Sequence, residues 1–218
     1  MTPSTVLFDL DGTLLDTAPD MGEAANRVLA EFDLPPLTRE QIYTHTSFGA
    51  RGLLTAGFGK QAKFQDPIAL RARFLYHYGQ AICQGTQVYD GIEALLDRLS
   101  RLKICWGIVT NKPEGLTHQL LAHFPRLQAA QVIVGADTYA HAKPHPLPLL
   151  EAAKTLNCAP ERCFYVGDIE NDTLAARAAN MQSVVAGWGY TGDPALISNW
   201  EADHIFTTPA QLSAFLGS

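Results

Sequence analysis

Apolar and polar residues alternate in two different ways along this chain. After residue 91, short apolar runs are separated by longer stretches in which apolar side chains recur at helical spacing. The short runs predict buried strands at 105–110, 132–137, 163–168, 183–190 and 204–208. The longer stretches predict helices at 92–102, from residue 113, at 146–156 and at 171–179. Strands that alternate with helices in this way predict a parallel sheet that is covered on both faces.

The chain before residue 90 follows a different pattern. Val6–Phe8 forms a first apolar run, but residues 16–89 show helical spacing and contain no convincing strand. Thr38 and Gln41 make a plausible capping box for one of the helices in this segment. We therefore predict an α/β protein with a Rossmann-like parallel sheet. Its core comprises residues 1–15 and 90–218, and a small helical domain of residues 16–89 is inserted after the first strand.

Polar side chains follow the ends of the expected strands. In parallel sheets, ligands bind in the crevice beyond the carboxyl ends of the strands, so these side chains are expected to share one site. They are Asp9 and Asp11 after the first strand, Thr110 and Asn111 after the second, Asp137, His141 and Lys143 after the third, and Asp168 and Asp172 after the fourth.

The types of these residues predict a metal and phosphate site. Asp9 and Asp11 lie two positions apart and point into the same space, where their carboxylates repel each other unless a cation lies between them. With Asp168 and Asp172 nearby, the acids favour an oxygen-liganded Mg²⁺ ion together with a phosphate substrate. Gly12 allows a close backbone approach, and Thr13 adds a hydroxyl and an N–H group beside the anion; both are therefore substrate-binding candidates.

The segment D-L-D-G-T allows two other interpretations. A calcium loop requires its glycine at the sixth position, whereas Gly12 is at the fourth, and an apolar strand precedes the segment. A structural Asx turn can account for this segment taken alone. It does not account for the polar residues at the other strand ends.

The composition indicates which binding partners and which cellular location to expect. The net charge of −6 and pI near 5.6 argue against a nucleic-acid or membrane-binding surface. The four cysteines form no C-x-x-C pair and are interpreted as reduced, and no export signal is visible, so a cytoplasmic location is expected. His141 and His145 are spaced H-x-x-x-H, but neighbouring prolines disfavour the regular helix that a metal site on this pair would need.

The segments DLDGT, TN, the lysine in AKPHP and GDIEND occur in this order, and together they resemble the four motifs of the haloacid dehalogenase superfamily. The resemblance covers the whole chain and implies a phosphatase or phosphomutase with a helical cap domain. It implies that Asp9 is the nucleophile, that Asp11 is the general acid and then the base, and that Lys143 balances charge. Thr110 or Asn111 would bind the phosphoryl group. Asp168 would bind Mg²⁺ directly, with Asp172 supporting it.

The substrate is less well defined by the sequence. TNKPEG and DTAPD resemble phosphoglycolate phosphatase-like enzymes, whereas SFGARGLL and GYTGDPALISNW resemble bacterial phosphatases of N-acetylmuramic acid 6-phosphate. The expected ligand is a small phosphate monoester, and the expected protein is a monomer or a homodimer. A sugar phosphomutase and a non-catalytic regulatory relative remain alternatives. Arg51, in an expected turn at 47–52, and Lys112 are either substrate ligands or solvated surface cations.

Overall fold

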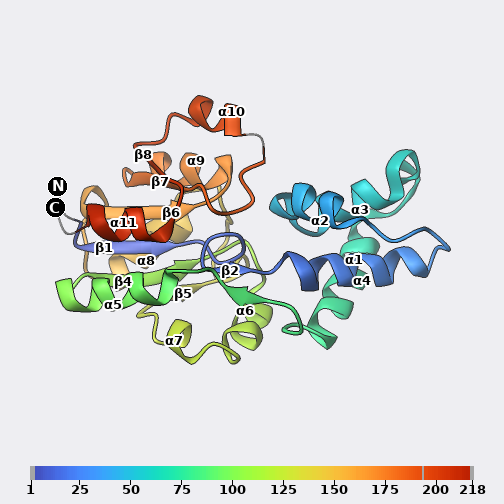
Figure 1. Ribbon diagram of the computed structural model, residues 1–218, viewed down its shortest axis with the longest axis horizontal. Coiled ribbons are helices and arrows are strands. Elements are labelled where there is room, and N and C mark those ends of the chain that lie inside the picture. Colours follow the sequence, from blue (N-terminus) through green and yellow to red (C-terminus); the bar gives the residue numbers. More distant parts are fainter. Residues whose placement is uncertain (1–2, 193, 217–218) are drawn as a thin grey trace. The chain divides into compact units, whose positions relative to one another are not determined.

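The computed structural model describes residues 3–192 and 194–216 (Figure 1). The chain forms two compact units, one of residues 1–15 and 88–218 and the other of residues 16–87. In the described part of the chain, no helix has both the length and the hydropathy needed to cross a bilayer.

The larger unit is built on a six-stranded sheet whose strands are all parallel. In spatial order the strands are β5 (Ile133–Val134), β4 (Cys105–Val109), β1 (Thr5–Phe8), β6 (Cys163–Gly167), β7 (Gln182–Ala186) and β8 (His204–Phe206). Leu7 in β1 lies opposite Gly107 in β4 and Tyr165 in β6. The predicted fold class is therefore confirmed.

Helices cover both faces of this sheet (Figure 1). On one face, α8 (Leu147–Thr155) and α9 (Glu170–Ala178) bury a core that includes Leu7, Val109 and Tyr165. On the other face, α5 (Ile92–Leu102) packs against α11 (Pro209–Phe215), and Phe8 contacts Trp106 edge to face. The shorter elements of this unit are α6 (Glu114–Leu121), α7 (Pro125–Gln128), η3 (Pro160–Arg162), α10 (Pro194–Ile197) and η4 (Ser198–Trp200).

The third predicted strand is much shorter than expected. Only Ile133 and Val134 pair with β4, because the chain then turns toward the start of α6. A Cβ atom on Gly135 would lie 2.5 Å from the Glu114 Cα atom, so this close approach requires glycine. Asp137 Oδ1 accepts a 2.7 Å hydrogen bond from the Glu114 N–H group. The prediction that Asp137 belongs to the polar site is therefore wrong, since its carboxylate binds the N-terminus of a helix.

The smaller unit is helical. Its elements are α1 (Ala18–Ala30), α2 (Arg39–His45), η1 (Thr46–Phe48), α3 (Gly49–Phe58), η2 (Gly59–Phe64) and α4 (Pro67–Gln80). The predicted capping box is present, with the Gln41 N–H group 3.2 Å from Thr38 Oγ1 and the Thr38 N–H group 2.9 Å from Gln41 Oε1. Two strands of two residues each, β2 (Leu15–Asp16) and β3 (Gln87–Val88), lie where the chain passes from one unit to the other. They were not predicted, because such short strands show no periodicity.

The turn predicted at 47–52 is also wrong. Gly49 has a φ of +60° and marks the break after η1, but α3 begins at that residue. Arg51 consequently lies in the first turn of a helix, where it is exposed. Whether it binds substrate stays a prediction.

A buried carboxylate joins the two ends of the helical unit. Asp20, in the first turn of α1, accepts hydrogen bonds from the backbone N–H groups of Gln84, Gly85 and Thr86 at 2.8–3.2 Å. The Asp20→Ala substitution would leave these donors without that acceptor. We expect it to destabilise the helical unit by roughly 2–4 kcal/mol, since an unpaired buried polar group costs about 1–3 kcal/mol.

Amide hydrogen exchange and thermal unfolding test this expectation. Exchange at residues 84–86 should accelerate in Asp20→Ala. Glu40→Ala removes an exposed acid from the first turn of α2 and should change stability by less than about 0.5 kcal/mol. Equal effects of the two substitutions would show that the Asp20 carboxylate does not stabilise this segment.

Candidate active site

A tight turn after β1 carries the first two acids. The Gly12 N–H group donates to Leu15 O at 2.8 Å, and the Leu14 N–H group donates to Leu10 O at 3.0 Å. Gly12 has a φ of +82°, which favours glycine. A Cβ atom there would also lie 2.2 Å from Asp168 Oδ2, so the turn approaches the end of β6 more closely than any side chain would permit.

Three buried carboxylates meet beyond the ends of β1 and β6. Asp9, Asp168 and Asp172 each offer an oxygen atom, and these atoms all lie within 4.8 Å of one another. All three residues are almost fully buried. Among the described residues, Asp11 does not belong to this cluster. Its two carboxylate oxygens instead accept hydrogen bonds from Lys112 Nζ at 2.9 and 3.1 Å.

Lys143 places its ammonium group inside the acidic cluster. Its Nζ atom lies 3.0 Å from Asp9 Oδ1 and 2.7 Å from Asp172 Oδ1. The side chain of Asn111 holds the backbone of Lys143 on both sides, donating to its carbonyl and accepting from its N–H group at 3.0 Å each. Because the Asn111 amide is engaged in this way, Thr110 is the better of the two candidates for binding a phosphoryl group.

Asp168 and Asp172 have different partners. Asp168 accepts hydrogen bonds from the Thr13 hydroxyl at 3.2 Å and from the Tyr190 N–H group at 2.9 Å. Asp172 accepts from Lys143 and from the Ile169 N–H group at 3.2 Å. The first carboxylate therefore meets only neutral donors, whereas the second already has a cationic partner.

Burial and mutual repulsion change the protonation of this group. Burial raises the pKa of Asp9 to about 6, while Lys143 opposes the shift and Asp172 and Asp11 add to it. Burial, with Asp172 and Asp9 nearby, raises the pKa of Asp168 well above its ordinary value. Although burial alone disfavours its charge, the net pKa of Lys143 is raised because Asp172 and Asp9 stabilise the ammonium. A single ammonium group does not offset three buried carboxylates.

The cluster fits a hard divalent cation. Asp9 Oδ1 is buried and accepts no hydrogen bond from the described residues, although the Lys143 ion pair lies beside it. The donor set consists of carboxylate oxygens, which suit Mg²⁺ better than softer metals. A cation bound by Asp9 and Asp168 would relieve the repulsion that raises their pKa values.

Comparison with known proteins decides the family. The profile of haloacid dehalogenase-like hydrolases matches residues 6–186, which include the three acids of the cluster and Lys143. The chain belongs to the haloacid dehalogenase-like hydrolase family. The predicted family is thus confirmed.

Relatives in this hydrolase family span nearly the whole chain. A phosphoglycolate phosphatase from Xanthomonas campestris is 46% identical over 96% of this chain and 95% of its own length. An N-acetylmuramic acid 6-phosphate phosphatase from Pseudomonas aeruginosa is 33% identical over 97% of this chain and 94% of its own. The crystal structure of a predicted phosphoglycolate phosphatase from Haemophilus somnus superposes with a TM-score of 0.86 at 25% identity, covering 99% of this chain and 98% of that one.

Three residues near the centre of this hydrolase site were not predicted from the sequence. Tyr165 was assigned to the core of a strand, yet its hydroxyl lies 2.7 Å from Lys143 Nζ. A tyrosine in a fully buried strand needs a hydrogen-bond partner, and this signal could have indicated it. Tyr190 binds Asp168 through its backbone, and the Trp188 Nε1–H group donates to Thr13 O at 2.9 Å. No sequence pattern identifies these two contacts.

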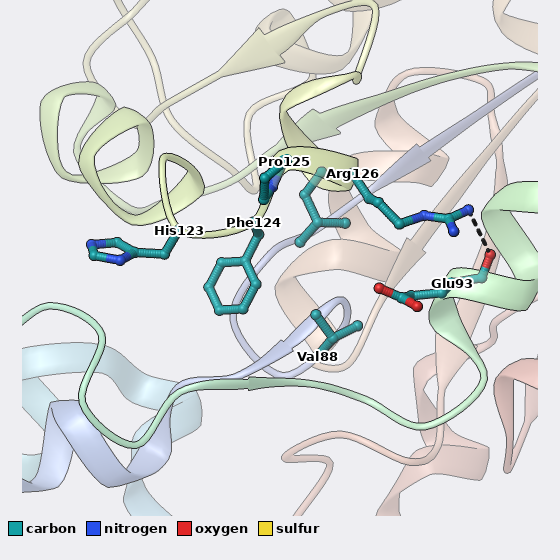
Figure 2. Close-up of a pocket in the computed structure, with 7 residues that line it drawn as sticks. Val88, Glu93, His123, Phe124, Pro125 and Arg126 are labelled. Carbon is teal, nitrogen blue, oxygen red and sulfur yellow. Dashed lines mark hydrogen bonds between the residues drawn. The ribbon is translucent and has the colours of Figure 1, made fainter.

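Figure 2 shows a separate pocket in the larger unit, with a volume of about 160 Å³. It is lined by Val88, Glu93, His123, Phe124, Pro125, Arg126 and Leu127. None of these residues belongs to the acidic cluster. Arg126 is already paired with Asp97 and lies 3.5 Å from Glu93 O. The guanidinium of this pocket is therefore already paired.

The different partners of Asp168 and Asp172 predict opposite effects of two isosteric substitutions. Asp168→Asn removes the cost of burying an acid whose pKa is raised by burial, and should raise the melting temperature of the metal-free protein at pH 7 by roughly 3–6 °C, corresponding to about 1–2 kcal/mol. Asp172→Asn removes the partner of a buried ammonium and should lower it. Added Mg²⁺ should raise the melting temperature of wild type and Asp172→Asn, but not that of Asp168→Asn.

The pH dependence supplies a further check. A carboxyl group with a raised pKa binds its proton more readily in the folded state, so its contribution to stability falls as pH rises through that pKa. The difference in melting temperature between Asp168→Asn and wild type should therefore shrink on acidification, because Asp168 in wild type is then protonated and neutral, as asparagine is. A metal response that survives in Asp168→Asn would contradict the assignment of Asp168 as a ligand.

Proposed function

We propose that this protein is a Mg²⁺-dependent phosphatase that hydrolyses 2-phosphoglycolate through an aspartyl-phosphate on Asp9. The observation that carries the proposal is the buried Asp9 carboxylate, which lies 3.0 Å from Lys143 and accepts no hydrogen bond on Oδ1 from the described residues. The 46% identity to a phosphoglycolate phosphatase over nearly the whole chain supports this choice of substrate.

In the first half-reaction, a carboxylate oxygen of Asp9 attacks phosphorus and the ester oxygen departs. Lys143 holds the carboxylate and offsets negative charge on the phosphoryl group. The Thr110 hydroxyl is the proposed donor to the phosphoryl oxygens. Gly12 and Thr13 stay predicted substrate-binding residues, although their N–H groups already donate within the turn and the Thr13 hydroxyl donates to Asp168. Bound Mg²⁺, held by Asp9 and Asp168, would supply neutralising charge for the phosphate dianion.

Asp11 is proposed to handle the protons of both half-reactions. It gives a proton to the departing alkoxide and then takes one from the water that attacks phosphorus, which regenerates Asp9. Lys112 bonds both oxygens of Asp11 and thereby fixes the orientation of the carboxylate. Lys112 is also a proposed ligand of the substrate phosphate. Arg51 remains a predicted ligand of the substrate carboxylate.

A panel of phosphate monoesters tests the proposal. With Mg²⁺ present, kcat/KM should be at least about tenfold higher for 2-phosphoglycolate than for N-acetylmuramic acid 6-phosphate, because a site that matches one substrate's charged group discriminates against another. The reverse order would favour the second substrate, which the 33% identical relative supports. If a labelled phosphoryl group were returned to a sugar phosphate and not released as inorganic phosphate, the protein would be a phosphomutase. Absence of hydrolysis of every ester would favour a regulatory role.

A further inference from the structure

The hydroxyl group of Tyr165 lies at the centre of the acidic cluster. Tyr165 is in β6 and is 1% exposed. Its hydroxyl lies 2.7 Å from Val109 O at the end of β4, 3.3 Å from Asp172 Oδ1 and 2.7 Å from Lys143 Nζ. A phenol has one proton, which Val109 O or Asp172 Oδ1 accepts, so the phenol oxygen accepts from Lys143.

This contact gives the Lys143 ammonium a neutral acceptor beside its two acidic partners. The group donates to Asp172 at 2.7 Å and to Tyr165 at 2.7 Å, and Asp9 lies 3.0 Å away as an ion-pair partner. A lysine side chain is a flexible four-carbon stem that ends in a freely rotating donor group. Without Tyr165, only the two carboxylates would hold this group. The Tyr165 oxygen supplies a third contact that carries no charge.

The position of Tyr165 in the sheet explains why a tyrosine is suited to this role. Tyr165 is paired in register with Leu7, and both side chains lie on the same face of the sheet. Asp9 follows Leu7 by two residues, so its side chain is directed to this face as well. Burial and the nearby Asp172 and Asp9 raise the pKa of Tyr165 well above its ordinary value, and the phenol stays neutral. A carboxylate at this position would add a fourth negative charge, and phenylalanine would offer no acceptor.

We propose that Tyr165 is a positioning residue that holds the Lys143 ammonium against Asp9 for phosphoryl transfer. The inference rests on the proposed function of Asp9 and Lys143. The replacement Tyr165→Phe removes one oxygen atom but leaves the metal ligands and the buried ring in place. The inference predicts that this replacement lowers the rate of the reaction.

The test compares Tyr165→Phe with Ser183→Ala. Ser183 is paired in register with Tyr165 on β7, and its buried hydroxyl donates to Asp203 at 2.9 Å. Both variants lose one buried hydroxyl, but only the first contacts Lys143. With 4-nitrophenyl phosphate and Mg²⁺, we expect kcat of Tyr165→Phe to fall roughly tenfold while KM changes less than about twofold. Ser183→Ala should keep kcat within about twofold of wild type.

A double-substitution cycle tests whether Tyr165 acts through Lys143. In a Lys143→Ala background, Tyr165→Phe should change kcat by less than about twofold, because the group it positions is gone. If turnover in that background is too slow to measure, the affinity for orthovanadate replaces kcat in the cycle. Melting temperatures of all variants show that each is folded.

Three results would overturn the inference. The first is a kcat of Tyr165→Phe equal to that of wild type. The second is a loss of kcat in Ser183→Ala as large as that in Tyr165→Phe. The third is an effect of Tyr165→Phe on kcat that is as large in the Lys143→Ala background as in wild type. Failure of the proposed substrate is a different result. In that case wild type would hydrolyse 4-nitrophenyl phosphate but not 2-phosphoglycolate, and the comparison of the Tyr165 variants would be unaffected.

Discussion

Replacement of Asp9 by asparagine is expected to lower kcat by roughly 10⁴-fold or more, the scale seen when a covalent nucleophile is removed. An amide is a poor nucleophile and a weaker metal ligand. Asparagine would also remove the charge that pairs with Lys143 at 3.0 Å. Rapid quenching with substrate labelled in its phosphate should trap an acid-stable, base-labile acyl phosphate in wild type and none in the variant.

The control for this prediction is Asp97→Asn, which makes the same chemical change at an exposed position on α5. It should retain full turnover and the trapped intermediate. Turnover of Asp9→Asn within tenfold of wild type would exclude Asp9 as the nucleophile. Labelled acyl phosphate in that variant would assign the nucleophile to another carboxylate.

Lys143→Ala is expected to reduce kcat by roughly 10²–10³-fold, the usual cost of losing one group that stabilises transition-state charge. It should also change the pH dependence. Burial raises the pKa of Asp9 to about 6, and Lys143 is the group that restrains this shift. Without the ammonium, Asp9 should hold its proton to higher pH. Because attack requires the carboxylate, the rising limb of kcat/KM against pH should move to alkaline pH.

Two further variants separate charge from geometry. Lys143→Arg keeps the positive charge but cannot direct three donors from one atom at Asp9, Asp172 and Tyr165. The rising limb of its kcat/KM against pH should therefore stay near that of wild type, whereas its kcat should fall. Lys154→Ala removes an exposed lysine and should change neither quantity. An unshifted pH limb in Lys143→Ala, in protein shown to be folded by its melting curve, would contradict the proposed coupling to Asp9.

Several features of the fold and site could be predicted because they depend on local pattern. Buried parallel strands are continuous apolar runs, so the positions of β1, β4 and β6 were visible in the sequence. The capping box of α2 is likewise a local pattern, formed by two residues three positions apart. The acids at strand ends could be assigned to one site because the carboxyl ends of parallel strands lie at the same edge of a sheet.

Other features depend on contacts between residues far apart in the chain. Asp137 occupies a strand-end position like that of Asp168, yet a turn at Gly135 directs its carboxylate to the N–H group of Glu114. Asp11 and Lys112 are 101 residues apart and form an ion pair that no local pattern records.

The sequence by itself determined the class of fold, the family and the edge of the sheet at which Asp9, Asp168 and Asp172 meet. Only the tertiary structure decided the pairing within that set, in which Lys143 joins Asp9 to Asp172, Asp168 is left with neutral donors, and Tyr165 becomes a polar member of the site. The physical reason is that residue spacing fixes which face of a strand a side chain occupies. Its hydrogen-bond partner there is set by the packing of elements that are distant in sequence.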